Sequence, residues 1–129
     1  MPSVLIVENE PDITEAFACF LTLRGYSVRT AADGPEALRQ MATERPHAVL
    51  LDIYLPTMNG LEVLRHVHAT APDLGVILVS ACIDQATRDL ALALGARACL
   101  QKPVSLHDLQ TFVAYTVAQR ASAAAPQWN

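Results

Sequence analysis

The sequence predicts one α/β domain in which a doubly wound, five-stranded parallel sheet is covered by helices on both faces. The chain has 129 residues, which is the length of a single domain. Its composition, 52% hydrophobic and 17% charged, is that of a compact globular protein. Short β-rich segments alternate with helical patterns, an order that indicates right-handed βαβ units.

Five segments have strand character, and they lie at 3–7, 26–31, 47–52, 75–80 and 98–101. The first, third and fourth are almost continuously apolar. Such runs are typical of parallel strands that are covered on both faces. These three segments are therefore expected in the interior of the sheet.

Five helices are predicted between and after these strands. One spans 12–24 and stops at Gly25, and another spans 84–94 and stops at Gly95. Others begin near Asp33, at Gly60, and at Ser105, which is a good N-cap. We assign 1–121 to the domain and the Ala-rich segment 122–129 to a flexible C-terminal tail or the start of a linker.

Charge and cysteine usage narrow the classes of function. The net charge of −4 argues against nucleic-acid binding by this chain. No apolar run has the length of a membrane span, and the N-terminus lacks a basic signal-peptide region. Three cysteines, Cys19, Cys82 and Cys99, lie in apolar runs without a CxxC pair. They are expected to be buried, reduced thiols of a cytoplasmic protein.

Polar residues follow four of the predicted strands. Glu8-Asn9-Glu10 comes after the first strand, and Asp52, Ser80 and Lys102 come at the ends of the third, fourth and fifth. Because ligands of such sheets bind beyond the carboxyl ends of the strands, these groups are expected to meet at one edge. Lys102 is the only lysine among nine Lys and Arg residues. A compact ammonium there suits contact with a single anionic oxygen.

This set of groups suggests phosphoryl chemistry. Carboxylates from two loops make a hard oxygen site suited to Mg²⁺. Beside such an ion, Asp52 can attack phosphorus and form an aspartyl phosphate. Lys102 would neutralise one phosphoryl oxygen, and the Ser80 hydroxyl would hydrogen-bond another.

The sequence resembles the receiver domains of two-component response regulators, the CheY-like family, over residues 2–121. The resemblance rests on VENEPD after the first strand, LLDIYLPTMNG around Asp52, VSA at Ser80 and QKP at Lys102. It implies the flavodoxin-like fold, with Asp52 as phosphoacceptor, Ser80 as switch hydroxyl and Lys102 as phosphate contact. It also implies Mg²⁺ bound by Glu8, Asn9, Asp52 and the backbone carbonyl of Tyr54, and it makes Lys102–Pro103 a candidate cis bond.

The resemblance further implies a bacterial, cytoplasmic phosphorelay switch rather than a turnover enzyme. Its phosphodonor would be a sensor histidine kinase, a phosphotransfer protein or a small phosphodonor. Phosphorylation would switch a face made by 84–94, 98–101 and the helix from Ser105. That face would bind a downstream effector protein or domain, or a second copy of the chain.

Two residues depart from the family pattern. Asn9 replaces the second acid, and Cys99 replaces an aromatic residue that moves with the switch hydroxyl. A degenerate receiver, acting as a phosphorylation-independent interaction module, is therefore the main alternative. A flavin mononucleotide site would need Ser, Thr and Gly where VENEPD stands. A phosphatase-like hydrolase would need an acid at Tyr54.

Overall fold

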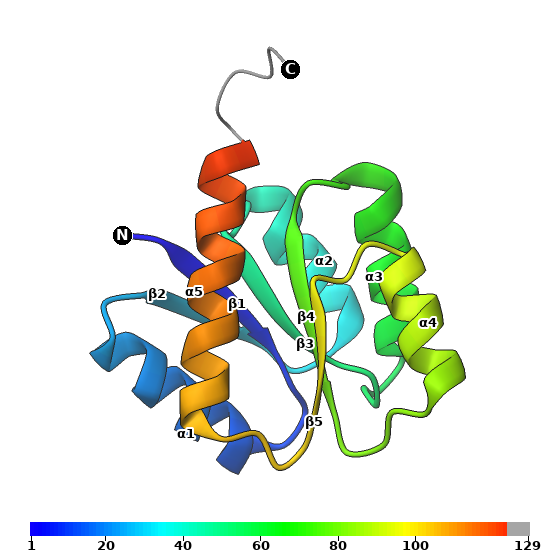
Figure 1. Cartoon of the computed structure of the whole chain (residues 1–129), viewed down its shortest axis with the longest axis horizontal. Helices are drawn as coiled ribbons and strands as arrows, with labels where there is room; N and C mark the ends of the chain where they lie inside the picture. Colours follow the sequence, from blue (N-terminus) through cyan, green and yellow to red (C-terminus); the bar gives the residue numbers. More distant parts are fainter. Residues whose placement is uncertain (124–129) are drawn as a thin grey trace.

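The computed structural model describes residues 1–123, in which five parallel strands alternate with five helices (Figure 1). The strands are β1 (Ser3–Val7), β2 (Ser27–Ala31), β3 (Ala48–Asp52), β4 (Gly75–Ser80) and β5 (Ala98–Gln101). The helices are α1 (Pro11–Leu23), α2 (Gly34–Thr43), α3 (Gly60–Thr70), α4 (Gln85–Ala93) and α5 (Leu106–Ala123). The sheet order is β2-β1-β3-β4-β5, which confirms the predicted doubly wound, flavodoxin-like (βα)5 fold.

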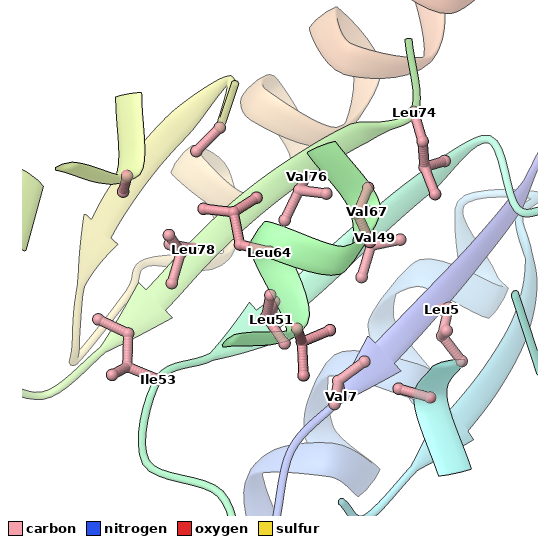
Figure 2. Close-up of a cluster of buried hydrophobic side chains, with 14 of the residues drawn as sticks. Leu5, Val7, Val49, Leu51, Ile53, Leu64, Val67, Leu74, Val76 and Leu78 are labelled. Atoms are coloured by element: carbon pink, nitrogen blue, oxygen red, sulfur yellow. The ribbon is translucent and has the colours of Figure 1, made fainter. Parts of the chain in front are cut away.

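Two apolar clusters fill the space on either side of the sheet, because successive side chains of a strand point to opposite faces. On β1, Val4 and Ile6 join the side chains of α1 and α5. Leu5 and Val7 join those of α2, α3 and α4 in the second cluster, which Figure 2 shows. Every residue of β3 and β4 is buried, and only the first residue of β1 is partly exposed, as predicted for interior strands.

Helix ends follow the sequence signals closely. The side chains of Asp33, Asn59 and Asp84 cap α2, α3 and α4 by accepting backbone N–H groups. Ser105 caps α5, since its hydroxyl accepts the N–H of Asp108 at 3.0 Å. Gly25 adopts a φ of +97° just after α1, a conformation that glycine tolerates better than other residues. These local contacts fix where each helix begins or stops.

The predicted burial of the cysteines is correct for one of the three. Cys99 is buried in β5 and is 9% exposed, but Cys19 and Cys82 are exposed free thiols. Cys19 lies on α1, where only part of an apolar run can face the core. Cys82 lies in the loop between β4 and α4. An apolar neighbourhood in sequence therefore did not decide burial on a helix or in a loop.

The last helix continues beyond the predicted domain boundary. α5 runs to Ala123, two residues past the proposed end of the domain at 121. The rest of the predicted tail, 124–129, lies outside the described residues. The peptide bond between Lys102 and Pro103 is cis, as expected from the resemblance.

Candidate functional site

The carboxyl ends of the central strands bring the sequence-predicted groups to one edge of the sheet. Asp52 is the last residue of β3 and pairs with Val79 of β4, so Ser80 stands one residue further along the next strand. Ser80 in turn pairs with Gln101 of β5, directly before Lys102. The backbone N–H of Lys102 donates to the Ser80 carbonyl at 2.8 Å. Strand register alone therefore aligns these residues.

Lys102 joins the two buried carboxylates. Its Nζ lies 2.7 Å from Glu8 Oε1 and 3.2 Å from Asp52 Oδ2. Glu8 and Asp52 are each only 5% exposed. Burial of carboxylates is costly unless they are paired and hydrogen-bonded, and one ammonium here serves both. This contact explains the position of the single lysine in the sequence.

The electrostatics of the pair favour an added positive charge. Burial raises the pKa of Asp52, and the neighbouring Glu8 carboxylate raises it further. Hydrogen bonds from the Tyr54 N–H and from Lys102 lower this pKa and offset only part of the increase. Burial alone would lower the pKa of Lys102, but its hydrogen bonds to Glu8 and Asp52 outweigh that effect and raise it. Lys102 therefore stays charged, but its charge does not fully offset the burial of Asp52 and the repulsion of Asp52 by Glu8.

Ser80 carries a buried hydroxyl without a partner. Its side chain is 0% exposed, and its Oγ makes no hydrogen bond with the part of the chain that the structure describes. A buried hydroxyl normally finds a partner, and an orphan of this kind often marks a functional position. The Ser80 hydroxyl is therefore available to an incoming oxygen atom.

Tyr54 and Asn9 lie at the site with their side chains in solvent. The backbone N–H of Tyr54 donates to Asp52 Oδ1 at 3.2 Å, while Tyr54 as a whole is 60% exposed. Asn9 is also exposed. Asp52 is thus held through both oxygens, by the Tyr54 amide and by Lys102.

Glu10 is the acidic neighbour to which the sequence assigned no role. Its Oε1 lies 3.8 Å from Lys102 Nζ, and its side chain is 65% exposed. Glu10 is the N-cap residue of α1, yet its side chain makes no capping hydrogen bond. The sequence did place Glu10 in the acidic segment after the first strand. A charged residue in an exposed loop is ordinary, however, and the contact with Lys102 is what distinguishes Glu10.

The loop after β3 fits tightly against the backbone of Asp52. A Cβ on Gly60 would lie 2.1 Å from the Asp52 carbonyl oxygen, so no side chain is tolerated there. The Gly60 N–H donates to the Ile53 carbonyl at 2.7 Å. Thr57 has a φ of +73°, a strained conformation for a β-branched residue. The loop is thereby folded back on the end of β3.

The donor set suits a hard divalent cation. Within residues 1–123 no three His, Cys, Asp or Glu side chains form a ready-made metal cage. Two buried carboxylates that repel each other are nevertheless present, together with an amide and backbone carbonyls. Mg²⁺ typically takes one or two protein carboxylates and keeps several waters. The residues present therefore fit Mg²⁺ better than a metal that needs a full protein cage.

The sequence profile of the response regulator receiver domain matches residues 4–114. The chain belongs to the response regulator receiver family. This membership sets aside the flavin-binding and phosphatase-like interpretations. Receiver domains are signalling domains of two-component systems, and they generally bind Mg²⁺ at an acidic pocket.

Curated relatives of this receiver domain include the "Response regulator MprA" of Mycolicibacterium vanbaalenii and of Mycobacterium tuberculosis H37Ra. They are 38% and 37% identical over 106 residues, which are 82% of this chain and 46% of each relative. The receiver domain thus spans about half the length of the curated relatives that it matches.

Solved structures agree with the fold. A receiver domain protein from Methanospirillum hungatei JF-1, described as CheY-like, superposes with a TM-score of 0.91 at 28% identity, covering 95% of this chain and 98% of that one. One from Clostridium thermocellum gives 0.89 at 25% identity, with 95% and 99% covered. None of the helices within residues 1–123 combines the length and apolar character that a membrane crossing requires.

Proposed function

We propose that this chain accepts a phosphoryl group on Asp52 in a Mg²⁺-dependent reaction and passes the signal to a partner. The observation that carries the proposal is the contact of Lys102 Nζ with both Glu8 and Asp52, at 2.7 and 3.2 Å. Ser80, whose buried hydroxyl has no hydrogen-bond partner within the described residues, ends the neighbouring strand β4 at the same edge of the sheet. Together these groups provide a nucleophile, a cation and a free hydrogen-bonding group for one tetrahedral anion.

The chemistry assigned to Asp52 is nucleophilic transfer. One Asp52 oxygen forms a bond to phosphorus while the bond from phosphorus to the donor's nitrogen or oxygen breaks, and the leaving atom keeps the electron pair. The amide of Tyr54 orients the carboxylate through Oδ1. After transfer, the Lys102 ammonium contacts one negatively charged phosphoryl oxygen, and the Ser80 hydroxyl donates a hydrogen bond to another.

Glu8, Asn9, Asp52 and the Tyr54 carbonyl are the proposed Mg²⁺ ligands, with water completing the set. When bound, Mg²⁺ supplies charge neutralisation between the attacking carboxylate and the phosphoryl group. Burial raises the pKa of Asp52 and the neighbouring Glu8 carboxylate raises it further, and a bound cation would favour the charged form of both carboxylates.

The phosphodonor is proposed to be a sensor histidine kinase, a phosphotransfer protein or a small acyl phosphate. A cleft of about 480 Å³ lies beside Lys102, with Ile13, Phe17, Ala81 and Val104 in its wall. This apolar surface between α1 and the β5–α5 loop suits the apolar face of a donor helix.

The proposed output face consists of α4, β5 and α5. Three large apolar residues are exposed on α4 and α5: Leu92 at 48%, Leu106 at 46% and Tyr115 at 54%. A protein partner that covers these side chains would remove their apolar surface from water, and we propose an effector domain or a second copy after phosphorylation. The greater length of the relatives supports the effector domain.

Intact-mass measurement after incubation with acetyl phosphate tests the proposal. Wild type with Mg²⁺ should gain one phosphoryl group, and both Asp52→Asn and wild type with EDTA should gain none. Glu62→Gln, an exposed acid on α3, serves as a variant that should label normally. Equal labelling of Asp52→Asn would refute the phosphoacceptor. An unlabelled wild type would favour the phosphorylation-independent interaction module.

A further inference from the structure

Glu10 is an acidic side chain beside Lys102 to which the proposed function gives no role. At the N-cap of a helix, a carboxylate usually accepts backbone N–H groups of the first turn. Glu10 makes no such bond with α1. Its carboxylate lies instead 3.8 Å from Lys102 Nζ, although 65% of the side chain is exposed and other positions are open to it.

The charge balance of the site explains what this carboxylate contributes. Glu8 and Asp52 carry two negative charges, and Lys102, which contacts both, cancels one of them. Asn9 adds no charge, so these residues leave a net charge of −1 for a dication. Counting Glu10 brings the net charge to −2 and matches the charge of Mg²⁺.

The buried carboxylates of Glu8 and Asp52 already accept hydrogen bonds within the protein. Glu8 Oε1 accepts from Lys102, and Glu8 Oε2 accepts the backbone N–H of Glu10 at 3.1 Å. Asp52 accepts from Lys102 and from Tyr54. Within residues 1–123 the Glu10 carboxylate contacts Lys102 alone, so it offsets the ammonium and lets Glu8 and Asp52 retain attraction for a cation.

We infer that Glu10 supplies the negative charge that Asn9 lacks, and that it acts as a positioning residue that raises Mg²⁺ affinity through its contact with Lys102. The inference rests on the proposed Mg²⁺ site. Glu10 acts through its charge rather than through a fixed coordination bond, since residues 1–123 contain no group of three acids placed to hold a metal ion.

Isothermal titration of the whole chain with Mg²⁺ tests this assignment without phosphorylation. We expect Glu10→Gln to bind roughly three- to fivefold more weakly than wild type, the size typical of a partly exposed charge contact. Glu62→Gln changes the net charge equally at another exposed helix start and should bind as wild type does. Equal affinities of Glu10→Gln and Glu62→Gln would overturn the inference.

A double variant separates charge compensation from a local structural effect. In the Asn9→Asp background a carboxylate is restored at the neighbouring position, so Glu10→Gln should cost less affinity than it does in wild type. The same loss in both backgrounds would also overturn the inference. Asp52→Asn is measured in parallel: if it binds Mg²⁺ as tightly as wild type, the proposed metal site itself is wrong. If it loses binding while Glu10→Gln does not, only the role of Glu10 is wrong.

Discussion

At the scale of single residues, Asp52 combines burial with a neighbour of the same charge. Both conditions raise its pKa above that of an unfolded chain, with burial the larger. The folded protein therefore holds the Asp52 proton more tightly than the unfolded protein does. The resulting loss of stability is fully present above the folded pKa, shrinks as the pH falls below that value, and is gone below the pKa of the unfolded chain.

We expect Asp52→Asn to increase the free energy of unfolding at pH 7, because the amide is neutral and remains able to accept from Lys102. Urea unfolding of the two proteins between pH 4 and 7 provides the measurement. The advantage of the variant should shrink as the pH falls toward about 4, where the unfolded carboxyl is also protonated. A variant that is less stable than wild type at neutral pH would contradict the assigned repulsion.

If Asp52 is phosphorylated as proposed, two side chains near it predict a long-lived phosphorylated state. By resemblance to the family, the residues two positions after Asp52 and after Ser80 flank the path of the attacking water. They are Tyr54 and Cys82, both exposed. A thiol is a weak hydrogen-bonding group, and the Tyr54 ring lacks the acid or amide that would orient water.

Decay of the phosphorylated protein after removal of the donor should accordingly be faster in Tyr54→Asn and in Cys82→Glu. Cys19→Glu, at the other exposed cysteine, should decay at the wild-type rate. If neither substitution near the site speeds the loss of phosphate, these residues do not control the approach of water.

At the scale of the elements, two glycines serve different purposes. Gly60 begins α3 where the backbone of β3 passes, with a Cβ position 2.1 Å from the Asp52 carbonyl oxygen. Gly25 ends α1 with a φ of +97° and has nothing within 4 Å of its Cβ position. Gly60 is required because there is no room for a side chain, and Gly25 is required because its backbone has a positive φ.

Alanine substitutions at Gly25 and Gly60 should separate the cost of a positive φ from the cost of a clash with the backbone. Gly25→Ala should lower the free energy of unfolding by about 1–2 kcal/mol, the cost of a left-handed conformation. Gly60→Ala should cost about 3 kcal/mol or more, because its clash is with fixed backbone atoms. Thermal and urea unfolding give both values. A Gly60→Ala variant that is no less stable than Gly25→Ala would show that the loop after β3 shifts freely.

At the scale of the whole molecule, the order of strands and helices followed from periodicity and turn residues. Because parallel strands present their carboxyl ends at one edge, the sequence also predicted that Glu8, Asp52 and Lys102 would lie together. The sequence did not predict features that depend on the conformation of loops and side chains. The turn of Glu10 toward Lys102, the positive φ of Thr57 and the exposure of Cys82 depend on how loops pack, which residue type alone does not specify.

The same packing predicts how a phosphoryl signal would spread. The orphaned Ser80 hydroxyl can turn toward a phosphoryl oxygen and draw the β4–α4 loop with it. Arg88 of α4 donates to the Cys99 carbonyl of β5 at 3.2 Å, which links the two elements. By resemblance to the family, Cys99 replaces an aromatic residue that moves with the switch hydroxyl. The structural change on phosphorylation should therefore remain small and local to α4 and β5.

Amide chemical shifts on addition of a beryllofluoride phosphoryl mimic should therefore change most across residues 80–88 and near Cys99. Asp52→Asn supplies the control for binding of the mimic elsewhere. Changes centred on α2 and α3 would contradict this route.

Locating the modified residue tests whether Asp52 carries the phosphoryl group. Borohydride reduces an aspartyl phosphate to homoserine, which tandem mass spectrometry identifies by position. After incubation with acetyl phosphate and Mg²⁺, homoserine should appear at residue 52 alone and should be absent when EDTA replaces Mg²⁺. Homoserine at another aspartate would rule out Asp52 as the sole phosphoacceptor, and the same yield at residue 52 with EDTA would rule out the requirement for Mg²⁺.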